Sequence, residues 1–242
     1  MPRALRLIVL GRQGAGKGTQ CARLAARLGV RHVATGDLLR AEITARSPLG
    51  LKVEAAVSQG HLVVDDLVLD VVASCLNSRE ARVCGYLLDG FPRTVSQAEA
   101  LFEEVGPMAA DLAIELHVPN EIAIPRLAAR RVCRGCGTTS TARPGDPVVR
   151  PCEQCGGEVA RRDDDTEDAI QRRLDIYDRE SGPLLDWLER KDLLLTVDGV
   201  GRADQVQGRL LAALTSRLPR AVPWSSVHAG STALTVSEGM AG

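Results

Sequence analysis

A glycine-rich loop directly after an apolar run is the feature that most constrains how this chain can fold. The apolar run is Leu5–Leu10, and residues 10–20 read LGRQGAGKGTQ. The glycines permit tight turns and close approach of a ligand to the backbone. Lys17–Leu28 then has the apolar periodicity of a helix. Because the first N–H groups of a helix are free and its N-terminus is electropositive, the order strand, loop, helix predicts a phosphate-binding loop.

The loop departs from the general pattern G-x-x-x-x-G-K-[ST], because Gly18 separates Lys17 from Thr19. In the general pattern the hydroxyl binds Mg²⁺ directly, so the displaced Thr19 predicts a less direct hold on the metal. Lys17 is one of three lysines in the chain and is the predicted partner of the β- and γ-phosphates. A glycine-rich turn that binds nothing is the alternative, which the order of elements argues against.

Apolar runs alternate with amphipathic stretches along most of the chain. After the first strand and helix, we predict strands at residues 83–88, 113–118 and 193–197, and helices from about residue 96 and at 120–131, 167–190 and 203–218. Such alternation requires crossover connections and therefore predicts a parallel α/β sheet. Residues 36–64 and 132–164 do not fit and are interpreted as insertions. Residues 219–242 lack periodicity and are predicted to be a disordered tail.

Four of the seven cysteines have the spacing of metal ligands. Cys133-x2-Cys136 and Cys152-x2-Cys155 are separated by fifteen residues, which is typical of a structural zinc site whose ligands all come from protein. An iron–sulfur cluster or two disulfides are the alternatives, the latter disfavoured in a reducing compartment. The cysteines at positions 21, 75 and 84 lie among apolar residues, so we expect them to be small buried hydrophobic side chains.

The composition argues against two classes of partner. A net charge of −1 and an aromatic content of 2% do not suit a broad nucleic-acid-binding surface. No stretch reaches the roughly 18 apolar residues of a membrane span, and the apolar N-terminal run has no small-residue cleavage site. We therefore expect a cytoplasmic protein that contacts neither nucleic acid nor membrane.

Further segments complete a recognisable pattern. They are HVATGDLLR (32–40), GHLVVDDLV (60–68), GYLLDGFPRTVSQAEAL (85–101), RLAARRVCRGCG (126–137) and RRDDDTEDAIQRRL (161–174). With GRQGAGKGTQ they resemble the adenylate kinases, specifically the long-lid bacterial type with a zinc-bearing lid, over about residues 5–215. In this family G-K-G-T is the normal form of the loop, so Gly18 is expected. Arg12 and Gln13 are less usual, since proline commonly replaces Gln13.

The resemblance implies an α/β P-loop kinase fold, in which a five-stranded parallel sheet is flanked by helices. It divides the chain into a core (1–35, 65–126 and 165–218), an AMP-binding helical insertion (36–64) and a zinc-bearing lid (127–164). The implied reaction is reversible transfer of the γ-phosphoryl group of ATP to AMP, giving two ADP. Mg²⁺ and a structural Zn²⁺ are the implied cofactors, and we expect a monomer.

The resemblance also implies roles for individual residues. The catalytic cations are Lys17, Arg93, Arg130, Arg162 and Arg173. The ATP-binding residues are Gly14, Ala15, Gly16, Lys17, Gly18, Thr19, Arg126, Arg130, Gly199 and Gly201. The AMP-binding residues are Thr35, Gly36, Arg40, His61, Leu62, Val63, Gly90, Arg93, Gln97, Arg162 and Arg173. Thr19 and Asp89 would hold Mg²⁺ through water, Asp164 and Asp165 would form a lid hinge, and Cys133, Cys136, Cys152 and Cys155 would bind zinc.

Two other functions remain open at this point. Related pyrimidine kinases tend to carry Asn after FPR, so Thr94 followed by Gln97 favours AMP; a kinase for UMP or CMP is the first alternative. A catalytically silent zinc ribbon is the second, and the presence of Lys17 and the arginines argues against it. Pro125 removes an N–H from the helix that carries Arg126 and can kink it, which bears on where Arg126 lies.

Overall fold

The core of the molecule is a single parallel sheet. The computed structural model describes residues 4–58, 65–106, 109–143, 145–161 and 166–218. Its five strands are ordered β2–β3–β1–β4–β9, and every neighbouring pair is parallel. They are β1 (Leu5–Leu10), β2 (Arg31–Ala34), β3 (Gly85–Asp89), β4 (Leu112–His117) and β9 (Leu194–Asp198). The predicted five-stranded parallel sheet is confirmed.

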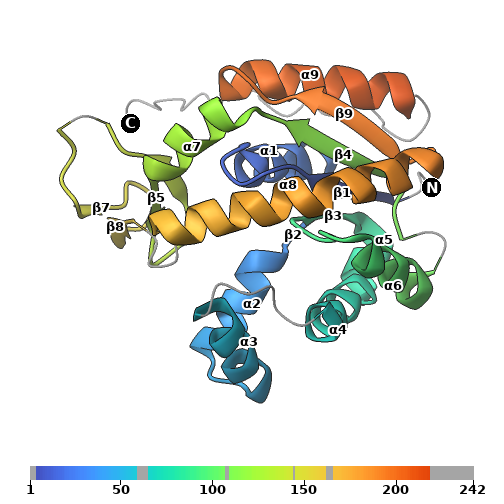
Figure 1. Ribbon diagram of the computed structural model, residues 1–242, viewed down its shortest axis with the longest axis horizontal. Helices are drawn as coiled ribbons and strands as arrows, with labels where there is room; N and C mark the ends of the chain where they lie inside the picture. Colours follow the sequence, from blue (N-terminus) through green and yellow to red (C-terminus); the bar gives the residue numbers. More distant parts are fainter. Residues whose placement is uncertain (1–3, 59–64, 107–108, 144, 162–165, 219–242) are drawn as a thin grey trace, which may run out of the picture.

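Helices cover both faces of this sheet (Figure 1). They are α1 (Lys17–Leu28), α2 (Thr35–Thr44), α3 (Pro48–Ser58), α4 (Asp65–Leu76), α5 (Arg79–Cys84), α6 (Val95–Val105), α7 (Asn120–Ala128), α8 (Glu167–Arg190) and α9 (Ala203–Arg217). Ile8 and Leu10 of β1 pack in one buried cluster with α4, α6 and α8, whereas Leu7 and Val9 pack in another with α1 and α9. Burial on both faces explains why β1 is continuously apolar.

The strand predicted at residues 83–88 begins two residues later than expected. Residues 83 and 84 belong to α5, which Ser78 caps by accepting a hydrogen bond from the Ala81 N–H at 3.2 Å. Gly85 has φ +80°, and a Cβ there would lie 2.2 Å from the Leu5 carbonyl oxygen. Only glycine can therefore start β3 beside β1. The expectation that Cys84 is buried was also wrong: it is exposed, Cys75 is half-buried and Cys21 is buried.

The helix predicted at residues 120–131 ends three residues early, at Ala128. Arg130 and Arg131 instead pair with Thr141 and Ser140 in a second, antiparallel sheet. That sheet has the order β6–β5–β8–β7, with β5 (Arg130–Cys133), β6 (Thr139–Thr141), β7 (Arg150–Pro151) and β8 (Glu158–Ala160). Pro125 lies inside α7 without ending it, so Arg126 remains on a continuous helix.

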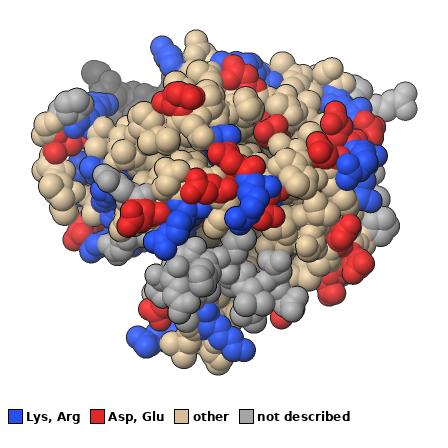
Figure 2. All heavy atoms as spheres, viewed as in Figure 1, with Lys and Arg blue, Asp and Glu red and all other residues tan. Residues whose placement is uncertain are grey.

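The surface bears charges of both signs. Figure 2 shows Lys and Arg side chains interspersed with Asp and Glu over the face that it draws. In the described part of the chain, no helix combines the length and apolar character needed to cross a membrane. The predicted tail, residues 219–242, lies outside the described residues.

Candidate functional site

The glycine loop between β1 and α1 has the geometry of an anion cradle. Gly11 and Gly14 have φ values of +139° and +81°, and a Cβ would lie 2.6 Å from the Leu116 carbonyl oxygen at the first and 2.4 Å from that of Ala123 at the second. Gly16 is the N-cap of α1, with φ 92° and no side-chain cap, and a Cβ on it would meet nothing within 4 Å. The position of a Gly16 side chain is therefore open, and the first N–H groups of α1, which have no partner within the helix, begin beside it.

Lys17 lies at the start of α1 and is held by the loop itself. Its Nζ donates hydrogen bonds to the carbonyl oxygens of Gly11 at 2.6 Å and Arg12 at 3.1 Å. Burial lowers the pKa of Lys17 and the charge of Arg93 adds to this, while Asp89 opposes it. The ammonium is therefore positioned at the cradle by interactions that a phosphate can replace.

Arg12 ties the loop to two helices, a function that sequence reasoning missed. Its Nη2 lies 3.1 Å from Asp178 Oδ1, its guanidinium carbon lies 5.3 Å from the centre of the Tyr177 ring, and its Nη1 donates a hydrogen bond to Asn120. Tyr177 and Asp178 are on α8, and Asn120 begins α7. These contacts restrain the loop at the residue before Gln13 by tying Arg12 to α7 and α8.

Arg93 is the centre of a group of cations near the carboxyl ends of the strands. Its Nε donates a hydrogen bond to the Gly90 carbonyl oxygen at 2.9 Å. Partial removal from water lowers the pKa of Arg93, the charges of Arg173 and Arg40 add to this, and Asp89 opposes it. Arg130 likewise acts on the pKa of Lys17. The structure therefore brings four of the five predicted catalytic cations together, and the fifth, Arg162, lies outside the described residues.

Hydrogen bonds within the segment that follows β3 fix the backbone at Arg93. The Arg93 N–H donates to Gln97 Oε1 at 2.7 Å. Thr94 caps α6 by accepting a hydrogen bond from the Gln97 N–H at 3.2 Å. Gln97 is buried. The GFPRT segment is thus built as a rigid turn that presents the Arg93 guanidinium, and Gln97 has a supporting contact in addition to any contact with a ligand.

The predicted AMP-binding residues on α2 lie at its N-terminal end. Thr35 is buried, and its hydroxyl has no hydrogen-bond partner among the described residues. A buried hydroxyl without a partner is costly, so a ligand atom would satisfy it. Arg40 pairs with Asp37 on the same helix, and a Cβ on Gly36 would lie 3.2 Å from its Nη1. The predicted ligands His61, Leu62 and Val63 fall outside the described residues.

Asp89 ends β3 and faces the start of α1. A Cβ on Gly18 would lie 3.8 Å from Asp89 Oδ2, and the Asp89 charge acts on both Lys17 and Arg93. Thr19 is exposed in the first turn of the same helix. Ligands of open α/β sheets bind at the carboxyl ends of the strands, and a carboxylate there can orient a hydrated Mg²⁺. Asp164 and Asp165, the predicted lid hinge, lie outside the described residues.

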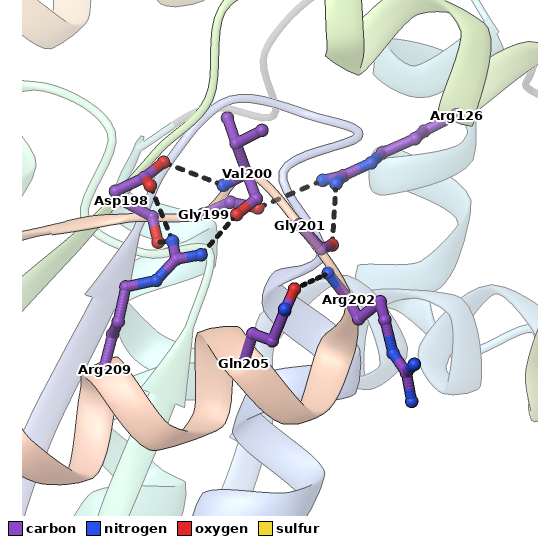
Figure 3. Close-up of polar contacts among 8 residues, drawn as sticks. All are labelled: Arg126, Asp198, Gly199, Val200, Gly201, Arg202, Gln205 and Arg209. Atoms are coloured by element: carbon purple, nitrogen blue, oxygen red, sulfur yellow. Dashed lines mark hydrogen bonds and ion pairs between the residues drawn. The ribbon is translucent and has the colours of Figure 1, made fainter.

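A second loop, residues 199–201 after β9, is where Gly199 and Gly201 are predicted to receive a nucleobase. Arg126 points toward it, with long hydrogen bonds of 3.4 Å to the carbonyl oxygens of Gly199 and Gly201 (Figure 3). Arg209 fastens the loop from α9: its guanidinium donates to the Asp198 carbonyl oxygen and carboxylate and, at 2.6 Å, to the Val200 carbonyl oxygen. The sequence offered no signal for Arg209, whose role depends on contacts nine to eleven residues away.

The four predicted metal-binding cysteines converge at one end of the second sheet. Their sulfurs all lie within 4.8 Å of one another, with 3.5 Å between Cys133 and Cys155 and 3.7 Å between Cys136 and Cys152. A disulfide needs about 2.05 Å, whereas sulfurs at the corners of a tetrahedron with Zn–S bonds of 2.3 Å lie about 3.8 Å apart. Hydrogen bonding to Thr138 lowers the pKa of Cys136 to about 6, whereas hydrogen bonds to the neighbouring cysteines raise the pKa of Cys155 to about 12, so a bound cation is needed to deprotonate the whole cluster.

Backbone geometry around the cysteines is that of two matching turns. Gly137 and Gly156 both have φ +73°, and their N–H groups donate to the carbonyl oxygens of Cys133 and Cys152 at 2.9 and 2.8 Å. The N–H of Gly135 also points to the Cys133 sulfur at 3.3 Å. Such N–H groups stabilise thiolate charge. The arrangement fits a four-thiolate metal site closed to substrate.

Comparison with known proteins gives the same family from several directions. Residues 9–193 match the family model described as adenylate kinase. An adenylate kinase of Thermodesulfovibrio yellowstonii is 40% identical over 216 residues, which cover 88% of this chain and 100% of the relative. One from Carboxydothermus hydrogenoformans is 38% identical over 213 residues, covering 87% and 99%. One from Clostridium novyi is 40% identical over 205 residues, covering 84% and 94%.

Proposed function

The chain belongs to the adenylate kinase family of ATP:AMP phosphotransferases, and we propose that it holds ATP and AMP on opposite sides of the cations around Asp89. The gathering of Lys17, Arg93, Arg130 and Arg173 carries this proposal. Phosphoryl transfer requires alignment and neutralisation of charge more than covalent help. These cations lower one another's pKa values because their positive charges repel. A bound phosphate group would supply negative charge that relieves this repulsion.

In this proposal ATP occupies the loop between β1 and α1. The backbone of Gly14, Ala15, Gly16, Gly18 and Thr19 receives its phosphates with Lys17, and Arg130 lies beside the group that is transferred. The loop at Gly199 and Gly201 receives the adenine together with Arg126. The fixed glycine conformations and the uncapped start of α1 support the first part, and the direction of Arg126 supports the second.

AMP occupies the other side. Arg93 and Arg40 grip its phosphate, Thr35, Gly36, Gly90 and Gln97 surround it, and Arg173 bridges toward the ATP site. His61, Leu62, Val63 and Arg162 complete the two sites in the proposal without structural support. The unpartnered Thr35 hydroxyl and the proximity of Arg40, Arg93 and Arg173 favour this division.

The metals have separate tasks. The family uses Mg·ATP, and we assign Asp89 and Thr19 to Mg²⁺ through water; the ion neutralises charge on the β- and γ-phosphates. Zn²⁺ is the proposed occupant of Cys133, Cys136, Cys152 and Cys155, because the sulfur separations suit tetrahedral thiolates. With four protein ligands it has no open position, so its proposed task is structural.

The division into domains, the oligomeric state and the compartment complete the proposal. We assign residues 1–35, 65–126 and 165–218 to the core, 36–64 to the AMP-binding insertion and 127–164 to the lid. The core assignment is supported by the two buried clusters, whose buried residues all lie in these ranges except Val53 of the insertion. We propose a monomer that works in a reducing compartment, the cytoplasm, because none of the seven cysteines forms a disulfide.

The acceptor is tested by a coupled assay of ADP formation with Mg·ATP and AMP, UMP or CMP in turn. We expect kcat/KM with AMP to exceed the pyrimidine values by at least about 10-fold, because a site that hydrogen-bonds one base leaves its polar groups unpaired with another. Faster turnover with UMP or CMP would establish the pyrimidine alternative. Lack of turnover with all three acceptors would refute the enzyme assignment.

Arg209 provides a test of the adenine loop. In Arg209→Met the contacts to Asp198 and Val200 are lost, so the loop is held less firmly and binding of ATP must pay for ordering it. We expect KM for ATP to rise by about 5- to 10-fold with little change in kcat, since the loop does not touch the transferred group. Steady-state kinetics at saturating AMP measure both constants.

The same helix supplies a matched control. Arg217 lies at the C-terminal end of α9 and donates hydrogen bonds to the carbonyl oxygen and carboxylate of Asp192. This contact resembles that of Arg209 but is remote from the loop. Arg217→Met should leave KM for ATP unchanged. Equal effects of the two substitutions would mean that Arg209 acts through helix stability instead of the loop.

A further inference from the structure

A second group of metal-binding side chains lies next to the phosphate loop. Cys21 of α1, His32 of β2 and Asp89 of β3 place a thiol sulfur, an imidazole nitrogen and a carboxylate oxygen within 4.8 Å of one another. The His32 Nε2 and Asp89 Oδ2 atoms are 3.5 Å apart. The proposed function uses neither Cys21 nor His32, so their convergence on Asp89 needs a separate explanation.

The imidazole nitrogen in this group has an unmet requirement. Nε2 of His32 is buried and makes no hydrogen bond to any described residue, and its contact with Asp89 at 3.5 Å is an ion pair only when the imidazole is protonated. A buried polar atom without a partner is costly. The Cys21 thiol already hydrogen-bonds to Asp89, so both neighbours compete for one carboxylate, whereas one cation between the three would bind all of them.

We propose that Cys21, His32 and Asp89 form a second metal site, distinct from the lid cluster and selective for a borderline divalent cation such as Zn²⁺. Sulfur, nitrogen and oxygen ligands together select Zn²⁺ over Mg²⁺, which prefers oxygen alone. Metal–ligand bonds of 2.0–2.3 Å in a tetrahedron place the ligand atoms about 3.2–3.8 Å apart. The spacing of His32 and Asp89 already lies in that range, and the Cys21 sulfur lies within 4.8 Å of both ligand atoms.

His32 borders open space at the surface, and a cation has reasons to bind at this group less tightly than at the lid. His32 lines a surface cavity of about 240 Å³ with Ala34, Asp37 and Cys75, whereas Cys21 and Asp89 do not line it. When Zn²⁺ binds, the thiol proton passes to solvent, and one thiolate and one carboxylate balance the charge of the ion. Lys17, whose charge acts on both Cys21 and Asp89, opposes any cation, and only three protein ligands are present.

Occupation of the site has a consequence for catalysis, which rests on the proposed role of Asp89. A carboxylate oxygen that ligates Zn²⁺ cannot at the same time orient the hydrated Mg²⁺ of Mg·ATP. An added divalent charge also lies beside Lys17, where it repels that ammonium. Zn²⁺ at this second site is therefore inhibitory, whereas Zn²⁺ in the lid is structural.

Binding is tested without nucleotide, on full-length protein whose lid cluster has been loaded with one equivalent of Zn²⁺. Co²⁺ is then added, since it binds Zn²⁺ sites but does not readily displace the tighter lid Zn²⁺. We expect one further equivalent to bind with a thiolate-to-cobalt absorption band. Cys21→Ala should abolish the band and weaken binding at least about 10-fold. His32→Asn should weaken binding while keeping the band.

Cys84→Ala is the matched control, because this thiol is exposed and outside the group; it should behave as wild type. Absence of a further equivalent, or a band that survives in Cys21→Ala, would overturn the proposed site. Thermal melting establishes that each variant folds, and concordant results from the two ligand variants guard against a packing artefact at Cys21.

Inhibition is measured separately as ADP formation at free Zn²⁺ held constant by a metal buffer, with excess Mg·ATP. Wild-type activity should fall as free Zn²⁺ rises, and Cys21→Ala should resist this fall. Equal inhibition of both proteins would overturn the inhibitory role. Activity without added Zn²⁺ reports on the proposed enzyme function alone, so failure of that function and failure of the second metal site are distinguished.

Discussion

Replacement of Lys17 by methionine should lower kcat for ADP formation by about 10³-fold while the protein remains folded. The methionine side chain keeps most of the apolar stem but removes the charge that the phosphate loop holds against the carbonyl oxygens of Gly11 and Arg12. Because this ammonium is proposed to stabilise charge on the transferring phosphoryl group, its loss should act on the rate more than on substrate binding. Single-turnover and steady-state assays measure the two effects.

Lys191, one of the two other lysines in the chain, provides a matched control. Lys191 lies at the C-terminal end of α8 with its Nζ 4.5 Å from the Trp187 ring centre, remote from the cations around Asp89. Lys191→Met should therefore retain wild-type kcat with a small loss of stability, on the order of 1 kcal/mol or less. Lys17→Arg should remain impaired, because a planar fork cannot take the place of a compact ammonium in this loop. Near-normal kcat in Lys17→Met would contradict the proposed role.

Removal of the lid metal should produce the largest change in stability. The buried cluster in this sheet comprises Cys133, Cys152 and Val159, so two of its three side chains are metal ligands and very little apolar surface remains without them. Zinc binding to such sites contributes on the order of 10 kcal/mol to folding. We expect chelation to unfold the lid region and to lower the main melting temperature by about 10 °C or more. Part of the lost free energy of unfolding belongs to the lid alone, because the lid can unfold locally.

Calorimetry of the holoprotein before and after chelation tests this expectation, and added Zn²⁺ should restore the original curve. Cys136→Ser should reproduce the effect at fixed metal, since it removes an exposed ligand without opening the buried cluster. Cys84→Ser is the control for loss of a thiol alone. A melting curve that chelation leaves unmoved would rule out a stabilising metal in the lid.

The phosphate loop shows why part of the site was predictable. Gly11, Gly14 and Gly16 adopt positive φ values that other residues rarely adopt, so their presence in a short segment already specifies the local backbone. The Cys-x2-Cys pairs are similarly local, because each pair sits on one turn that ends at a glycine. Helix α1 was predicted with its observed ends for the same reason: periodicity and capping are properties of neighbouring residues.

Elements whose boundaries depend on distant residues were less predictable. Strand β2 has four residues, of which Val33 is buried, so it lacks the apolar run by which a buried strand is recognised in a sequence. Its pairing with β3 defines it as a strand. The start of β3 depends on the approach of Gly85 to Leu5, and the end of α7 depends on pairing of Arg130 with Thr141. In each case a contact between chain-distant residues outweighs local propensity.

The sequence by itself determined the α/β class, the phosphate loop, the four-cysteine site and, through resemblance, the family. Each of these depends on the spacing of residues that are close together in the chain. The tertiary structure alone decided that Arg12 reaches Asp178, that Arg209 fastens the loop after β9, and that Cys21 and His32 meet Asp89. These contacts join side chains from different elements. Their formation depends on strand register and helix packing, which no local pattern of residues encodes.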